Sequence, residues 1–448
     1  MRHDCGMLNE ELRLTAEDEV VGIAQDLMRM DTSNFGNFDA RGERPAAEYL
    51  AEKLAEVGLS CQLVESEPGR TSLLADWAPE GTDSSLPPLL IHGHTDVVPA
   101  EASDWTYPPF AAEIADGCLW GRGAVDMLNM DAMIVSVIRQ RQREGRAPRR
   151  PIRLAFFADE EAGSGLGADY IAQNHPEFFE GVTQAIGEVG GFSLTVKDDL
   201  RFYLIQTGEK GLAWLKLIAE GTAGHGSMRN FDNAVTELAG AVARIGAHEW
   251  KTEVHPAQRA FLDAIEIALD IEIQDDSIEE TLNRLGAISR MIGAAMSDTA
   301  NPTVLSGGYK ANVIPSRAEA QIDGRFLPGH RDEFFATIKE LIGEKVRLEV
   351  MTERDSVEAE FASSLVDAMQ WSLNLEDPQA QTVPYLVSAG TDAKGFANRF
   401  GIAAYGFCPL QLPAGFDFTA MFHGVDERVP IESLKFGTRV LDHFLDRA

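Results

Sequence analysis

The sequence predicts an α/β protein into which a second, α+β domain is inserted, and three observations support this prediction. The chain has 448 residues, which is too long for one ordinary core. Before residue 208, short apolar runs alternate with helical patterns, as in a sheet covered by helices. The order then changes, and α/β-like sequence returns near residue 356.

The first part of the α/β domain is expected to begin with two helices. A capping box at Thr15 precedes the first apolar stripe of helical spacing, and a second stripe ends at Gly58, a typical residue after a helix C-terminus. Apolar runs at 89–91 and 152–157 flank a helical stretch at 132–142. This alternation predicts strands of one sheet with helices on its faces.

The inserted domain is expected at residues 208–355, between a first catalytic part at 1–207 and a second at 356–448. No long Pro- or Gly-rich linker separates the parts, so two short connections should join them. Between its first helix and next strand lie two further helical patterns, which predict a helical insertion. The expected elements are strands at 212–220, 312–326 and 346–351, helices at 233–245 and 333–342, and insertion helices around 262–269 and 278–292.

Charge and composition exclude several classes of partner. Lys and Arg total 39 against 71 Asp and Glu, so the net charge of −32 opposes nucleic acid and anionic membranes. No apolar stretch approaches the roughly 20 residues of a membrane span, and the first residues lack a signal-peptide core. The cysteines show neither zinc-knuckle spacing nor disulfide density. We therefore expect a cytoplasmic protein that binds neither nucleic acid nor membranes.

Residues with metal-ligand chemistry follow the apolar runs. His94 and Asp96 come directly after the run at 89–91, two residues apart, so on an extended chain they leave the same face. A carboxylate beside a ligating imidazole can fix its tautomer, although a lone strand-end histidine is also a common structural residue. Asp126 ends a glycine-punctuated turn, which alone could be an ordinary turn.

Asp159, Glu160 and Glu161 follow the run at 152–157. Three acids at a strand end are costly unless they are protonated, solvated or neutralised by cations, and a solvated acidic loop remains an alternative. Glu188 and His423 end two further apolar segments. Mixed nitrogen and oxygen ligands suit Zn²⁺, Co²⁺ or Mn²⁺, and they suffice for two ions if one aspartate bridges. The sequence thus points to a binuclear hydrolase.

These motifs follow one another in an order that resembles a known family: His-x-Asp, Gly-Arg-Gly-x-x-Asp, Asp-Glu-Glu, an isolated Glu and a C-terminal His. It is the di-zinc aminoacylase and carboxypeptidase family, which includes acetylornithine deacetylase, succinyl-diaminopimelate desuccinylase and bacterial glutamate carboxypeptidase. The resemblance spans roughly residues 15 to 445. It implies a catalytic domain with a mixed central sheet, an inserted lid and dimerisation domain, and a cis peptide bond after Asp126.

The resemblance also implies roles for individual residues. Asp126 would bridge two metals, Glu160 would be the general base and acid, and Asp96 would support the site from behind the ligands. In the lid, His225 would stabilise the oxyanion, although a turn histidine is the alternative. The remaining assignments are His94 and Glu188 on one metal, Glu161 and His423 on the other, Asn312 and Arg325 as substrate contacts, and Gly390 and Thr391 in a substrate loop that could equally be a helix start.

The expected activity is hydrolysis of an amide bond next to a free carboxylate, in an N-acyl amino acid or a short peptide. The alternative is a metal-bound binding or scaffold protein that has lost catalysis, and the presence of Glu160 argues against it. There is one departure from the family: many relatives continue after the bridging aspartate with Asp or Met and then Lys-Gly, whereas this chain has Met127-Leu128-Asn129. This difference leaves metal ligation intact but puts the substrate-side wall in doubt. Relatives also often dimerise and place the matching His225 in the partner's site, whereas a long helical insertion could keep this chain monomeric.

Overall fold

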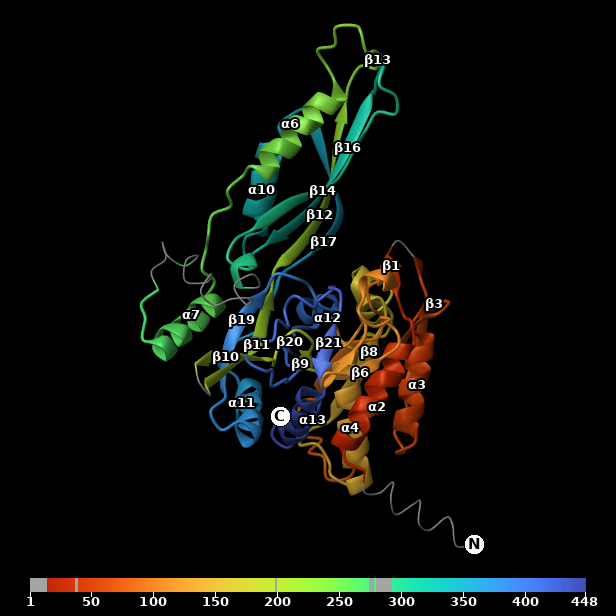
Figure 1. Cartoon of the computed structure of the whole chain (residues 1–448), viewed down its shortest axis with the longest axis vertical. Helices are drawn as coiled ribbons and strands as arrows, with labels where there is room; N and C mark the ends of the chain where they lie inside the picture. The colour runs from red at the N-terminus through yellow and green to blue at the C-terminus, as the bar shows by residue number, and fades with distance from the viewer. Residues whose placement is uncertain (1–13, 37–38, 198–199, 274–277, 279–291) are drawn as a thin grey trace.

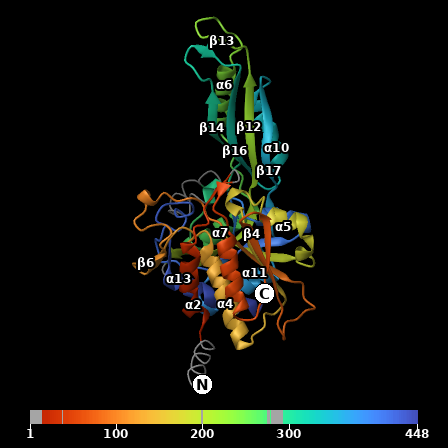
Figure 2. The same cartoon turned by 90° about the vertical axis from the view of Figure 1, so that its right-hand side faces the viewer.

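The computed structural model describes residues 14–36, 39–197, 200–273, 278 and 292–448. A broad α/β body lies below a long, narrow second unit that rises from it (Figure 1, Figure 2). We call this second unit the lid. No helix in the described part of the chain has the length and apolarity needed to cross a membrane.

The body is built on a ten-stranded mixed sheet with the order β10-β11-β20-β9-β5-β8-β4-β3, in which β18 and β19 also pair with β11. Strand β5 runs parallel to both β8 and β9, and β9 runs parallel to β20. The carboxyl ends of these four strands therefore meet at one edge of the sheet. The strands are β3 (Gln62–Glu67), β4 (Arg70–Trp77), β5 (Leu89–His94), β8 (Ile152–Phe157), β9 (Gln184–Gly187), β10 (Ser193–Lys197), β11 (Leu200–Glu209), β18 (Val357–Glu358), β19 (Gln381–Val387) and β20 (Ala403–Gly406).

Helices cover both faces of this sheet because its strands are apolar on both sides. On β8, Leu154 and Phe156 join the core under one group of helices, whereas Ala155 and Phe157 join the core under another. The first group is α2 (Ala16–Arg29), α3 (Arg44–Ala55), α4 (Leu128–Glu144), α11 (Ser364–Glu376) and α13 (Ile431–Leu445), and the second is α5 (Ala168–Asn174) and α12 (Ala393–Phe400). The predicted fold class, a mixed sheet flanked by helices, is confirmed.

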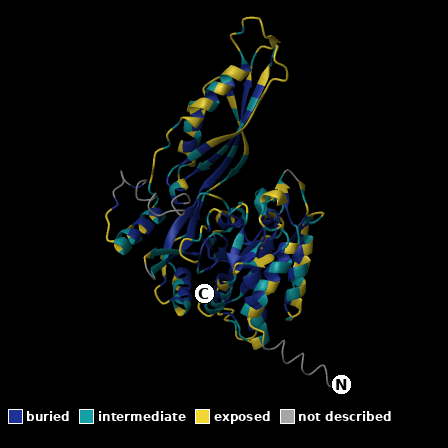
Figure 3. Ribbon diagram, viewed as in Figure 1, coloured by how far each residue is buried: buried dark blue, intermediate teal, exposed yellow. Residues whose placement is uncertain are grey.

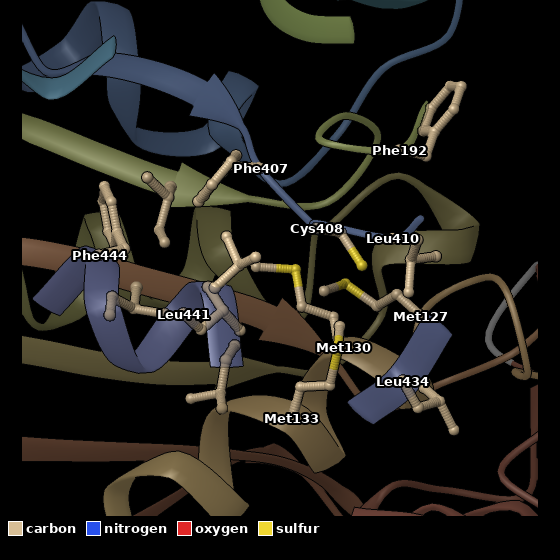
Figure 4. Close-up of a cluster of buried hydrophobic side chains, with 14 of the residues drawn as sticks. Met127, Met130, Met133, Phe192, Phe407, Cys408, Leu410, Leu434, Leu441 and Phe444 are labelled. Carbon is tan, nitrogen blue, oxygen red and sulfur yellow. The ribbon is translucent and has the colours of Figure 1, made fainter. Parts of the chain in front are cut away.

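Helix α4 carries the chain out of the metal-ligand turn into the core. Figure 4 shows Met127 and Met130, at its start, beside Cys408, with Leu434 and Leu441 of α13 nearby. All five side chains are buried. The helix begins four residues before the predicted stretch at 132–142. A capping box at Thr15 starts α2 as predicted.

The lid is a four-stranded antiparallel sheet with the order β14-β16-β12-β17, covered on one face by α6 (Ala234–Gly246) and α10 (Arg331–Ile342). Its strands are β12 (Gly211–Glu220), β14 (Thr299–Gly307), β16 (Arg317–Phe326) and β17 (Val346–Arg354). At the far tip, β13 (Gly224–His225) pairs with β15 (Val313–Ile314). Figure 3 shows that this tip and the outer face of α6 are exposed.

Three features of the inserted region differ from the expectations. The predicted strand at 312–326 is two strands, β15 and β16, separated by Pro315 and Ser316, because proline has no N–H to donate to a ladder. Strand β14 was not predicted. Helix α7 (Pro256–Leu269), from the predicted insertion, packs against β19 of the body rather than against the lid, and most of the second insertion pattern at 278–292 lies outside the described residues. The domain boundaries at 207/208 and 355/356 stay a prediction.

Short elements complete the body. Strands β6 (Glu113–Ala115), β7 (Cys118–Trp120) and β21 (Arg428–Pro430) form a three-stranded sheet that ties the Gly121 turn to the segment after His423. The other short elements are β1 (Asn34–Gly36), β2 (Asp39–Ala40) and the 3₁₀ turns at Ala102–Asp104, Glu160–Ala162 and Pro176–Phe179.

Candidate metal centre

Parallel strand ends bring the predicted metal ligands together. His94 ends β5, Glu160 and Glu161 follow β8 in a 3₁₀ turn, and Glu188 follows β9 directly. His94 lies opposite Phe157 in the β5–β8 register, so the acidic turn begins beside the imidazole. This edge, beyond the carboxyl ends of the strands, is where open α/β sheets build their sites.

Asp126 stands between the two histidines. Its Oδ1 lies 3.1 Å from His94 Nε2, and its Oδ2 lies 3.4 Å from His423 Nε2. Glu188 Oε2 is 3.4 Å from His94 Nε2, and Glu161 Oε2 is 2.9 Å from His423 Nε2. The five side chains thus form two groups that share the Asp126 carboxylate, and these groups contain the residues that the sequence analysis predicts as ligands of two metal ions. The peptide bond between Asp126 and Met127 is cis, also as predicted.

His94 is held with its Nε2 facing the carboxylates. Its ring is fully buried, and its Nδ1 lies 2.9 Å from the main-chain oxygen of Asp96. Nδ1 therefore carries the proton, which leaves Nε2 as a lone-pair donor for a metal. The side chain of Asp96 is farther from the ring, at 3.5 Å, so the main-chain carbonyl is the closer partner of the imidazole.

Asp96 instead fixes the acidic turn. Its Oδ1 accepts from the Glu160 amide and its Oδ2 from the Glu161 amide, both at 3.1 Å. Asn34 Nδ2 bridges the two neighbouring carboxylates, at 2.8 Å from Asp96 Oδ2 and 3.1 Å from Asp159 Oδ1. The backbone that carries Glu160 and Glu161 is thereby held in place by the buried Asp96 side chain.

A buried ion-pair network supports the same turn from behind. Arg70 donates through Nε and Nη2 to Glu43, and through Nη2 to Asp159 Oδ1 at 2.7 Å. Asp159 also accepts from the Leu166 amide at 2.8 Å. The roles of Asn34, Glu43 and Arg70 were not predicted from the sequence. A buried arginine that opens a strand and a glutamate before a helix give no local signal of this role.

Glu427 was also missed, and it holds the turn that presents Asp126. Its side chain is fully buried. Oε1 accepts from the amides of Val125 at 2.6 Å and Asp126 at 3.0 Å, whereas Oε2 accepts from the Gly123 amide at 3.1 Å and Arg122 Nη1 at 2.8 Å. Glu427 follows His423 by four residues, so one short segment carries His423 and also holds the turn of Asp126.

Strained backbone surrounds the ligands. Asp159, Val189 and His423 all have positive φ, at 66°, 56° and 57°. For a β-branched residue such as Val189 this region is rarely populated, and such residues cost about 1–3 kcal/mol each. They persist where the surrounding structure demands them, which is typical of functional sites.

The charges at the centre fit divalent cations. Burial raises the pKa of Glu188 to about 8, and the carboxylates of Asp126 and Glu161 add to the shift. Burial and nearby Glu188 likewise raise the pKa of Glu160 well above its usual range. Glu161 Oε1 is buried without a hydrogen-bond partner in the described structure. Clustered carboxylates with an unused oxygen atom are stabilised by cations, and the nitrogen and oxygen donors match Zn²⁺ and related ions.

Two cavities meet at this centre and share Glu160, Glu161, Gly390 and His423 in their walls. One, of about 350 Å³, extends past Val189, Val387 and Phe422, and we call it the inner cavity. The other, of about 360 Å³, extends toward the lid strands and is lined by Trp214, Arg325, Arg354 and Lys394, so we call it the cationic cavity.

The structure separates the predicted lid residues into two groups. Arg325 lines the cationic cavity with Glu160. His225 and Asn312 lie at the exposed tip, where the Gly226 amide donates to the Asn312 carbonyl, and neither lines a described cavity that contains Glu160. Thr391 lines the cationic cavity, but its hydroxyl donates to Glu209 Oε1 at 2.5 Å.

Comparisons with known proteins agree with this geometry. The chain is 27% identical to aminoacylase-1 of Sus scrofa over 401 residues, covering 86% of this chain and 85% of the relative. Its fold is similar to that of the M20 family metallo-carboxypeptidase Sso-CP2 from Sulfolobus solfataricus, with a TM-score of 0.71, 19% identity and coverage of 96% and 99% of the two chains.

A second solved structure is the YXEP protein of Bacillus subtilis, described as a dinuclear metal binding peptidase from the M20 family. Its TM-score is 0.58 at 13% identity, with 96% and 97% of the two chains covered. The profile of peptidase family M20/M25/M40 matches residues 90–447, which is most of the chain and includes every predicted metal ligand. The chain belongs to this peptidase family, and the resemblance read from its motifs is confirmed.

Proposed function

We propose that the chain is a two-metal hydrolase that cleaves an amide bond next to a free carboxylate, in an N-acyl amino acid or a short peptide. One observation supports this most directly: the two oxygens of Asp126 face different histidines, each of which has a second carboxylate beside it. The similarity to aminoacylase-1 supports the substrate class.

In this proposal, His94, Glu188 and Asp126 hold one metal ion, and Asp126, Glu161 and His423 hold the other. Zn²⁺ is the first choice, with Co²⁺ or Mn²⁺ as alternatives, because the donors are imidazole and carboxylate without thiolate. When bound, such ions supply Lewis-acid activation of a water molecule and of the scissile carbonyl.

Glu160 moves the proton. Its Oε2 lies 3.9 Å from His94 Nε2, at the junction of the two cavities, so it can reach a water at the centre and the departing amine. Burial favours its protonated form, and this suits a carboxylate that must accept a proton from water and then give it to the leaving nitrogen. Arg325 in the cationic cavity would bind the substrate carboxylate.

We also propose a homodimer in which His225 and Asn312 act in the partner's site. Both lie at the lid tip rather than at the metal centre of their own chain. Strand β14 is an edge of the lid sheet, and its Val304 and Leu305 side chains are exposed. Helix α7, in the described part of the helical insertion, packs on β19 of the body and not on this edge.

The body at 1–207 and 356–448 would then be the catalytic domain, and 208–355 the lid and dimerisation domain. A cytoplasmic location is supported by the cysteines, because Cys61, Cys118 and Cys408 are free of disulfides in the described structure.

The test is a hydrolysis panel of N-acetyl amino acids, N-succinyl amino acids and dipeptides with Zn²⁺, Co²⁺ or Mn²⁺. We expect metal-dependent release of a free amino acid from at least one class. A chain that binds two metal ions and hydrolyses none of these substrates would instead be the binding or scaffold relative.

A further inference from the structure

The cationic cavity has more positive groups than one carboxylate requires. Arg325, Arg354 and Lys394 come from three different elements and line the same space as Glu160. We propose that Arg354 binds a second anionic group of the substrate, so that the preferred substrate is an N-acyl or peptidyl derivative of an acidic, dicarboxylic amino acid. This inference rests on the proposed hydrolase function and specifies its substrate.

The carboxylate partners of these cations lie outside the cavity wall. Arg325 donates to Asp323, Lys394 lies 3.2 Å from Glu209, and Arg354 pairs with Asp169, but none of the three acids lines the cavity. Each acid therefore orients its cation from behind. A ligand entering the cavity from the metal centre therefore meets the guanidinium groups of Arg325 and Arg354, in a chain whose net charge is −32.

Arg354 is held in place and still has donors to offer. It ends β17, and its Nη2 donates to the Gly163 carbonyl at 2.8 Å and forms an ion pair with Asp169. Within the described part of the chain, both of these contacts use Nη2, so the Nε and Nη1 donors are available to a ligand. A planar guanidinium with two free donors suits a carboxylate better than a neutral amide.

The other cations are less suited to this second role. Arg325 is assigned to the carboxylate next to the scissile bond. Lys394 has 7% of its side chain exposed and already binds Glu209 and the Lys210 carbonyl at 2.6 Å. The inner cavity is lined by apolar side chains and by the acids of the centre, with no lysine or arginine among its described lining residues, so an anionic group of the substrate fits the cationic side of the centre better.

The test compares isosteric substrate pairs: N-acetyl-L-glutamate with N-acetyl-L-glutamine, and N-acetyl-L-aspartate with N-acetyl-L-asparagine. For the metal-loaded wild-type chain we expect kcat/KM to favour the acidic member by about 10- to 100-fold, since the neutral member leaves the half-buried Arg354 guanidinium without a carboxylate partner. Arg354→Gln should abolish this preference. Arg347→Gln, an exposed arginine on the same strand, is the matched control and should keep it.

A purely structural role for Arg354 predicts different rates for these variants. If the arginine only ties β17 to Gly163 and Asp169, then Asp169→Asn should resemble Arg354→Gln, and both should lower activity on all four substrates equally. If Arg354 binds the second carboxylate of the substrate, Asp169→Asn retains the guanidinium and therefore most of the preference for acidic substrates. Equal rates on both members of each pair in the wild-type chain, or an unchanged ratio in Arg354→Gln, would overturn the proposal.

A binding measurement separates this inference from the proposed function. Calorimetry with L-glutamate and L-glutamine on the same metal-loaded chains should give tighter binding of L-glutamate, lost in Arg354→Gln. If no amide is cleaved but this pattern appears, the subsite stands and the hydrolase assignment fails. If neutral substrates are cleaved and L-glutamate has no advantage, the hydrolase stands and the subsite is wrong.

Discussion

Glu160 and Asp126 lie in the same buried cluster, but the proposed reaction uses them differently. Glu160→Ala should keep both metal ions and lose activity by about 10²- to 10⁴-fold, because a proton shuttle need not be a ligand. Asp126→Ala should lose metal as well as activity, because one carboxylate serves both ligand sets. Metal content per chain and turnover, measured on the same samples, test the pair. A Glu160→Ala chain with wild-type turnover contradicts the assignment.

Glu427 should matter to metal binding although it is not a ligand. Glu427→Gln replaces one of two accepting oxygens by an amide donor that faces main-chain N–H groups, so the Asp126 turn should loosen. We expect metal affinity to fall about 10- to 100-fold, as for other groups that orient ligands. Competition with a chromogenic chelator measures it. Glu432→Gln, an exposed acid nearby, is the control and should bind metal normally.

At the level of residues, the sequence predicted the side chains that cluster at the centre, including Asp96 behind them, but not the other residues that hold them in place. His94, Glu161 and Glu188 could be recognised because each follows an apolar run whose end must lie at the sheet edge. Arg70 and Glu427 could not, because they act through contacts with residues far away in the chain. Such pairings depend on the tertiary fold, which periodicity does not encode.

The β14 edge of the lid supports a prediction about assembly. Leu305→Asp introduces a charge on β14, the edge strand that pairs only with β16, at a position where the leucine is 63% exposed. If two lids meet along this edge, burying that charge should convert the dimer to a monomer in sedimentation experiments. Leu375→Asp, on the exposed face of α11, is the matched control and should leave the dimer intact. Dimers of both variants would exclude this edge as the interface.

At the level of elements, short strands with strong apolar runs were predictable, and β8 has the predicted bounds of 152–157. The β14 strand was missed because Asn301-Pro302 interrupts its pattern and most of its side chains are exposed. The apolar stripe of α7 identified a buried face, but it could not show that this face packs on β19 of the body.

Across the whole molecule, subunit mixing tests whether His225 acts in the partner's site. Glu160→Ala and His225→Ala chains should each be inactive, yet a mixed dimer combines an intact Glu160 with the partner's intact His225 at one site. Random exchange of equal amounts should restore roughly a quarter of wild-type activity, since about half of the dimers are mixed. Glu160→Ala mixed with Asp126→Ala should restore none. An active monomer contradicts the role in trans.

Metal removal should also lower the stability of the body. The ligands come from strands and loops spread between residues 94 and 423, so bound ions tie together segments that are distant in the sequence. At a free metal concentration 100 times Kd, binding contributes about 2.7 kcal/mol to the free energy of unfolding. Chelation should therefore lower Tm in calorimetry. The Asp126→Ala chain should show no such shift, and an equal shift would mean that another site binds the metal.

The order of strands in the body sheet constrains how much of the protein can fold during its synthesis. Strand β20 lies between β9 and β11, although some 190 residues, including the whole lid, separate it from β11 in the chain. While the polypeptide is emerging from the ribosome, β9 and β11 therefore have no neighbour between them, and the segment with His423 is translated later still. The lid can form before the body is complete, and an ion held by Asp126, Glu161 and His423 could be captured only after residue 423 has been translated.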